Sequence, residues 1–310
     1  MGRPLRFLPQ PNTSFEVTIR CVQGRLLLRP CGELNDLVLG VLGRALSLYP
    51  AVKLHLVTVA SNHMHLLVTV PETEALSRFM CFVNSNIARE VGRLHRWGEK
   101  FWGRRFRAIA VLDDRALLER ARYILSHGCK EDLVGRPADW PGIQCADALS
   151  RGAKLRGTWY DRTKEYRSRR ARKKTSGESF STSYEVALAP LPCWEGLGEA
   201  ERRRRASELI AEIERDERRR RGRGGMLGRR RVLQQDPHSV PTEAKRGRAP
   251  SCHSSEPELR KSFVQSYRAF LDAFRRAARK LRQKRKLVPF PEHCFPPSVG
   301  YWSPAAAAAG

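Results

Sequence analysis

The apolar and polar positions in residues 1–150 alternate between strand-like and helix-like segments. Short β-rich apolar runs predict strands, and apolar residues spaced three or four positions apart predict amphipathic helices. The expected strands are 15–21, 25–28, 52–60, 63–70 and 104–112, and the expected helices are 34–48, 75–95 and 115–126. This order predicts an α+β fold in which helices flank an antiparallel sheet.

Local signals mark several boundaries of these elements. Gln23-Gly24 predicts a hairpin between the first two strands, and Ser61-Asn62 predicts a second hairpin. Asp113-Asp114 predicts the N-terminal cap of helix 115–126. Much later, Ser255 and Glu258 match the S-x-x-E capping box and predict that a helix begins there.

The pattern changes after residue 150, which divides the chain into four expected parts. Residues 1–150 are expected to form a globular domain, and residues 151–256 a basic linker with an Arg-rich helix at 201–221 and a loop at 234–257. Residues 257–303 form a basic, amphipathic helical region, and the alanine-rich residues 304–310 form a disordered tail. The fold class is therefore an antiparallel α+β domain with a basic, mainly helical C-terminal extension.

The net charge indicates which kind of partner the protein binds, and the cysteines indicate in which cellular compartment it works. The net charge is +26, and residues 151–310 carry most of it, because the first half has 20 basic and 14 acidic residues. Such a charge favours a polyanion as the binding partner, and nucleic acid is favoured over an anionic membrane surface. No apolar stretch approaches the roughly 20 residues that span a bilayer. Eight scattered cysteines without a C-x-x-C pair indicate a reduced, intracellular protein.

Two histidines provide the first candidate for chemistry. His63 and His65 flank Met64 on a predicted strand, so both imidazoles point to one face, where they can bind a metal ion. The alternative is that the two histidines lie on a polar surface, or that they are a core pair whose hydrogen bonds are satisfied within the protein. Cys252-His253 with His293-Cys294 is a weaker zinc candidate, because its spacing is not that of a standard zinc site.

A tyrosine on a predicted helix, taken together with the histidine pair, suggests a specific reaction. Tyr123 and His127 are four residues apart and share a helix face, which could supply a nucleophile and a third metal ligand. The alternative is a tyrosine that packs in the core. A metal that polarises a phosphate and a tyrosine that forms a covalent phosphoenzyme together suit phosphodiester transfer. The chain has no phosphate-binding loop of the G-x-x-x-x-G-K-[ST] type.

Three arginines are candidates for contact with DNA. Arg104, Arg105 and Arg107 lie along the predicted strand 104–112, near the proposed site. Arg105 and Arg107 share one face of that strand and could bind the DNA backbone.

Several motifs resemble those of a known family. These are the run Ser61-Asn62-His63-Met64-His65-Leu66-Leu67-Val68, the helix over 79–91, and the segments 101–106 and 122–125. Together they resemble the IS200/IS605-type Y1 transposases of the HUH superfamily, and among these most of all the REP-associated tyrosine transposases. The resemblance covers about half of the chain, residues 10–150.

The resemblance implies a DNA transposase: a single-strand DNA endonuclease and strand transferase that acts on hairpin-forming repeats. His63 and His65 would bind the divalent metal, Mg²⁺ or Mn²⁺, and Tyr123 would become joined to the 5′ phosphate. His127 stands where family members place Gln or Asn, so this third ligand is a departure. The expected location is the cytoplasm, associated with the bacterial nucleoid, and a homodimer and a monomer both remain open.

Two alternatives come from other functional classes. One is a domesticated, catalytically inactive nucleic-acid-binding protein, which the change at His127 keeps in consideration. The other is an unrelated basic RNA-binding protein, which would leave His63, His65 and Tyr123 as a coincidence.

Overall fold

The computed structural model describes residues 5–172, 176–241, 249–283 and 288–294. The expected disordered tail at 304–310 lies outside these residues. None of the described helices is both long and apolar enough to cross a membrane.

A five-stranded sheet forms the centre of the fold, with strand order β2-β3-β1-β4-β7. Its first four members pair antiparallel, and β7 pairs parallel with β4 at one edge. The strands are β1 (Thr13–Arg20), β2 (Lys53–Ala60), β3 (His63–Val70), β4 (Arg107–Val111) and β7 (Cys252–His253). The predicted α+β class with an antiparallel sheet is confirmed, whereas β7 interrupts a segment that was expected to be a loop.

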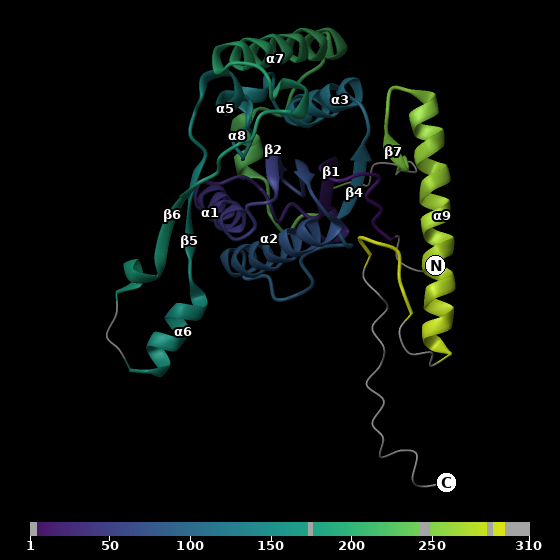
Figure 1. The fold of residues 1–310 in the computed structure, drawn as a ribbon. Helices are drawn as coiled ribbons and strands as arrows, with labels where there is room; N and C mark the ends of the chain where they lie inside the picture. Colours follow the sequence, from purple (N-terminus) through teal and green to yellow (C-terminus); the bar gives the residue numbers. More distant parts are fainter. Residues whose placement is uncertain (1–4, 173–175, 242–248, 284–287, 295–310) are drawn as a thin grey trace.

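Helices cover both faces of this sheet (Figure 1). Helices α1 (Gly32–Leu48) and α2 (Thr73–Leu94) lie on one face, and α3 (Asp114–Leu125) lies on the other. The short helix α4 (His127–Lys130) follows α3 directly. The apolar residues at alternate positions of the central strands pack toward α1 and α2, and they form the main core: Phe15, Val17, Ile19, Met64, Leu66 and Val68.

Three local expectations are wrong, and in two of them a distant segment supplies the hydrogen bonds. Residues 25–28 form no strand, since the chain there bonds to the β2–β3 turn through Leu28 N–H and the Ser61 carbonyl at 2.8 Å. Arg104 and Arg105 precede β4, which begins only at Arg107. Helix α9 (Pro257–Arg282) has Glu256 rather than Ser255 at its N-cap, because the Ser255 hydroxyl donates to Asp113 at 2.8 Å.

The region expected to be a basic linker contains regular structure. Strands β5 (Arg156–Tyr160) and β6 (Ser181–Glu185) form a two-stranded ribbon along the outer side of α1 (Figure 1). The remaining helices of this half are α5 (Ala146–Arg151), α6 (Arg162–Arg170), α7 (Glu199–Arg221) and α8 (Arg229–Gln234). Single 3₁₀ turns occur at Val22–Gly24, Pro137–Asp139, Gly177–Phe180 and Pro192–Trp194.

Ion pairs join α7 to α3 and to the segment just after α4, on the face of the sheet opposite α1 and α2 (Figure 1). Arg122 of α3 lies 3.2 Å from the Glu212 carboxylate, and Arg220 lies 2.6 Å from Asp132, just beyond α4. Most arginines near the start of α7 pair with acidic residues of the same helix: Arg203 with Glu199, Arg204 with Glu201 and Glu208, and Arg205 with Glu201. The charge of α7 is thus largely compensated within the protein.

Helix α9 has an aromatic face and a basic face. The ring of Phe7 packs against Phe263, Tyr267 and Phe270, with ring centroids 5.5, 5.8 and 5.3 Å apart. The opposite face exposes basic side chains along its length: Lys261, Arg268, Arg275, Arg276, Arg279, Lys280 and Arg282. One side of this helix therefore packs against the N-terminal half of the chain, and the other side exposes positive charge to solvent.

A close approach between α1 and β5 generates a stability prediction. A side chain at Gly40 would collide with the Thr158 carbonyl group, although alanine by itself favours a helix by about 1 kcal/mol. We expect Gly40→Ala to lower the free energy of unfolding by about 1–3 kcal/mol in urea denaturation. Gly98→Ala is the control, because nothing lies within 4 Å of its added methyl group, and it should change stability little.

His55 generates a prediction about pH. Its side chain is 0% exposed, its Nε2 lies 2.8 Å from the Thr69 hydroxyl, and burial lowers the pKa of its imidazole. Below about pH 6.5 the unfolded imidazole gains a proton before the folded one does, so stability falls as pH falls. Between pH 7.5 and 5.5 we expect the wild type to lose more unfolding free energy than His55→Gln, as urea denaturation at the two pH values would measure. Equal losses would contradict this assignment.

Candidate metal centre and tyrosine

The two strand histidines lie side by side on the face of β3 that looks toward α3. The register pairs His65 with Thr18 of β1 and His63 with Arg20, and the two imidazole centroids are 5.0 Å apart. Met64 points to the opposite face and is 1% exposed in the core. The period of two along the strand therefore separates the polar pair from the apolar core.

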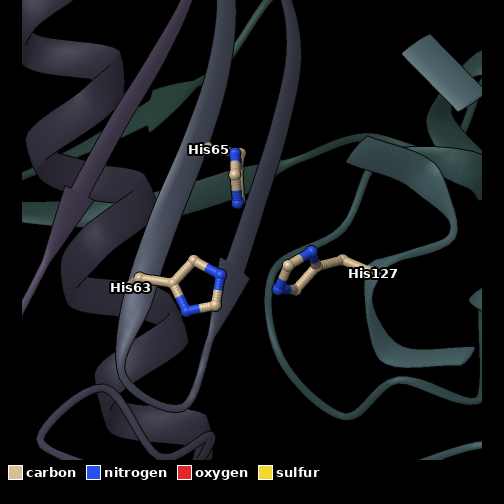
Figure 2. Close-up of side chains that lie close together, drawn as sticks. All are labelled: His63, His65 and His127. Carbon is tan, nitrogen blue, oxygen red and sulfur yellow. The ribbon is translucent and has the colours of Figure 1, made fainter. Parts of the chain in front are cut away.

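His127 reaches the same point from the other side (Figure 2). Its imidazole centroid lies 4.4 Å from that of His63 and 4.8 Å from that of His65. One ligand nitrogen from each of the three histidines falls within 4.8 Å of the others. Within the residues that the structure describes, this is the only group of three or more His, Cys, Asp or Glu side chains with such an arrangement.

The electrostatics of the cluster suit a cation. Burial, together with the neighbouring histidines, lowers the pKa of both His63 and His127, so their imidazoles are neutral at neutral pH. His127 is 3% exposed, and neither of its ring nitrogens has a hydrogen-bond partner among the described residues. Unsatisfied buried nitrogens are costly, whereas a neutral imidazole is a common metal ligand. The three histidines thus fit a divalent ion.

The outer ring nitrogens of the strand histidines have protein partners. His65 Nδ1 lies 3.2 Å from the Thr18 hydroxyl and 3.2 Å from a Glu16 carboxylate oxygen. His63 Nδ1 lies 2.5 Å from the Asn62 side-chain oxygen. Contacts of this kind fix the orientation of a metal-binding imidazole and leave its other nitrogen, Nε2, for the metal.

Glu16 and His253 belong to this site and were missed by the sequence analysis. Glu16 is 5% exposed, and its second carboxylate oxygen lies 2.8 Å from His253 Nε2 and 3.7 Å from Arg120. Burial alone would raise the pKa of Glu16, but its contacts with His253 and His65 lower it below its usual range. One sequence feature could have revealed Glu16: it is an acidic residue between two apolar residues in the middle of a strand.

Tyr123 lies beside the cluster on α3 and is partly exposed. Its ring centroid is 5.5 Å from that of His65 and 6.0 Å from that of His127. Two cations approach the ring: Lys130 Nζ lies 3.4 Å from its centroid, and the Arg120 guanidinium lies 5.0 Å away. A phosphate that reached Tyr123 would therefore meet positive charge.

The N-terminus of α3 is fixed by Asp113, as the sequence predicted. The Asp113 carboxylate accepts a hydrogen bond of 2.8 Å from Ala116 N–H and so caps the helix. It also accepts hydrogen bonds from Ser254 and Ser255, which come from the far end of the chain. The helix that carries Tyr123 is therefore tied to the segment around β7.

The candidate DNA-binding arginines are distributed differently from the prediction. Arg107 is exposed and lies in register with Thr18, which is in register with His65, so all three side chains share the site face. Two strand spacings place Arg107 about 10 Å from His65. Arg104 and Arg105 lie outside the strand, and Arg105 stacks 5.9 Å from the Phe106 ring.

The weaker zinc hypothesis fails. Cys252 is buried and His253 contacts Glu16, and no metal-ligand cluster of the described residues joins them to His293 and Cys294.

The comparison with protein families finds a match for the segment that contains the three histidines. Residues 43–127 match the family model described as "Transposase IS200 like". This segment is similar to the IS200-like transposases. It begins within α1 and ends at His127, so it includes His63, His65 and Tyr123. The resemblance to IS200/IS605-type Y1 transposases is confirmed for this part of the chain.

Comparisons with whole proteins add weaker similarities. The structure of a REP-associated tyrosine transposase bound to a REP hairpin is 18% identical, with a TM-score of 0.41, over 49% of this chain and 87% of the other. A putative transposase from Deinococcus radiodurans is 15% identical, with a TM-score of 0.29, over 40% of this chain and 94% of the other. No curated protein matches the chain.

Proposed function

We propose that this protein is a metal-dependent tyrosine transposase that cleaves and rejoins single-stranded DNA at hairpin-forming repeats. The observation that carries the proposal is the triad of His63, His65 and His127 beside Tyr123, in which His65 and His127 are buried and His63 is partly buried. All four residues lie in the segment that matches the IS200-like transposase model. Together they supply a metal site and a nucleophile for phosphodiester transfer.

In the proposed reaction Tyr123 attacks a DNA phosphate. A divalent metal held by the three histidines would polarise the scissile phosphate. The Tyr123 oxygen loses its proton and forms a bond to phosphorus, while the bond to the 3′ oxygen breaks and that oxygen leaves as a hydroxyl. Attack by another 3′-hydroxyl then reverses these steps and rejoins the strand, so the energy of the phosphodiester bond is conserved.

Cations around Tyr123 support the binding of a phosphate there. Lys130 and Arg120 lie against the tyrosine ring, and their charges would hold a phosphate group for in-line attack. We assign Arg107, and with it Arg104 and Arg105, to contacts with the DNA backbone beyond the scissile phosphate. The exposed basic face of α9 offers a further sequence-independent surface for the same polyanion.

We infer Mn²⁺ or Mg²⁺ as the metal, with Mn²⁺ favoured. Imidazole suits metals softer than Mg²⁺, which prefers oxygen ligands in octahedral geometry. A site with three imidazoles and no direct carboxylate ligand therefore fits Mn²⁺ better than Mg²⁺. The catalytic unit in this proposal spans residues 1–150, and either a monomer or a homodimer is compatible with it.

The second candidate is a nucleic-acid-binding protein without catalytic activity. His127 in place of the Gln or Asn of the resembled family motivates this reading. The buried, unpartnered nitrogens of His127, directed at the other two histidines, argue for a working ligand instead.

A covalent adduct with DNA tests the proposed nucleophile. With labelled single-stranded hairpin DNA and Mn²⁺, the wild-type protein should form an adduct that survives SDS electrophoresis, and Tyr123→Phe should form none. Tyr166→Phe is the control, because Tyr166 is 63% exposed on α6, and this variant should react like the wild type. An adduct in Tyr123→Phe would reject the nucleophile. DNA binding by the wild type without an adduct would favour the second candidate.

The third ligand generates a prediction about metal preference. His127→Gln replaces an imidazole with an amide oxygen, the harder ligand, so Mn²⁺ binding should weaken by about tenfold while Mg²⁺ binding weakens less. His127→Phe should weaken the binding of both ions strongly. Isothermal titration calorimetry of the protein without DNA measures both constants. Unchanged Mn²⁺ affinity in His127→Phe would exclude His127 as a ligand.

A further inference from the structure

We propose that His253, in the C-terminal half of the chain, is a positioning residue of the metal centre and acts through Glu16 on His65. The inference rests on the proposed metal-dependent function and adds to it a component from outside the family segment. It implies that the metal site is completed by a strand that joins the sheet from near the end of the chain.

The contacts form a continuous path from the C-terminal segment to the metal ligand. His253 Nε2 lies 2.8 Å from one Glu16 carboxylate oxygen, and the other oxygen lies 3.2 Å from His65 Nδ1. The side chains of His65 and Glu16 are 5% and 6% exposed, and that of His253 is 12% exposed, so solvent screens these contacts little. Each carboxylate oxygen of Glu16 thus has a histidine nitrogen within 3.2 Å, which favours the orientation that faces His65.

The backbone explains why His253 lies at this position. Strand β7 pairs parallel with β4 and places His253 in register with Val111, on the face that carries Glu16. The His253 carbonyl accepts a hydrogen bond of 2.9 Å from Leu112 N–H. Directly after it, Ser254 and Ser255 bind the cap residue Asp113. The segment is thus fixed on both sides of the histidine.

Other partners of Glu16 do not replace His253. Arg120 is the remaining cation near the carboxylate, but it lies 3.7 Å away, and its guanidinium also lies over the Tyr123 ring. Thr18 contacts His65 rather than Glu16. Loss of His253 would therefore leave one carboxylate oxygen with only a distant, partly exposed arginine, and the Glu16 side chain would be free to turn toward it.

Two size-matched substitutions separate positioning from packing. His253→Phe keeps a planar ring but removes the polar contact with Glu16, whereas His253→Gln keeps an N–H donor. Mn²⁺ affinity of the full-length protein without DNA is the readout, measured by calorimetry or by electron paramagnetic resonance. Urea denaturation in EDTA reports the stability of each variant separately.

We expect His253→Phe to weaken Mn²⁺ binding by about tenfold or more, and His253→Gln to remain within about threefold of the wild type. Glu16→Gln should weaken binding as much as His253→Phe, and the double variant should be no weaker than Glu16→Gln alone, because both changes act on one path. Adduct formation by His253→Phe should recover at saturating Mn²⁺.

Three results would overturn the inference. Unchanged Mn²⁺ affinity in His253→Phe, or additive effects of the two substitutions, would show that His253 does not act through Glu16. A loss of affinity that merely follows a loss of unfolding free energy, equal in the Phe and Gln variants, would show a packing role alone. Absence of Mn²⁺ binding by the wild type would instead reject the metal-dependent function itself and the inference with it.

Discussion

The antiparallel register between β1 and β3 is the constraint on which the candidate site depends. It sets Thr18 beside His65 and Arg20 beside His63, and it brings Glu16 within reach of His65. Because side chains alternate across a strand, the same register sends the apolar residues of both strands into the core under α1 and α2. A slip of one residue would exchange the two faces and destroy core and site together.

The basic C-terminal half is a structural part of the fold. Helix α7 braces α3 and α4 through ion pairs at Arg122 and Arg220, and β7 extends the sheet at its open edge. Exposed ion pairs contribute little stability individually, so the stabilising part of α7 is the burial of Ala206 and Ile213 in the main core. The basic side chains that line the outer face of α9 remain exposed to solvent.

Local patterns were reliable where local interactions decide the structure. The strands around His63 and His65, the helix 75–95 and the cap at Asp113 appear close to their expected places. The patterns failed where a distant partner captured the backbone or a side chain. Ser255 donates to Asp113 instead of capping its own helix, and residues 25–28 bond to the β2–β3 turn instead of forming a hairpin.

The sequence by itself determined that His63 and His65 share a strand face. This follows from the fixed period of the backbone, which depends only on neighbours along the chain. It also predicted that Tyr123 and His127 share a face of one helix, but α3 ends at Leu125 and His127 begins α4, although the two rings remain neighbours. Only the tertiary structure decided that His127 meets the histidine pair and that Glu16 links His65 to His253. These contacts depend on strand pairing and helix packing between segments as far apart in the sequence as Glu16 and His253. No local pattern of apolar and polar residues specifies such contacts.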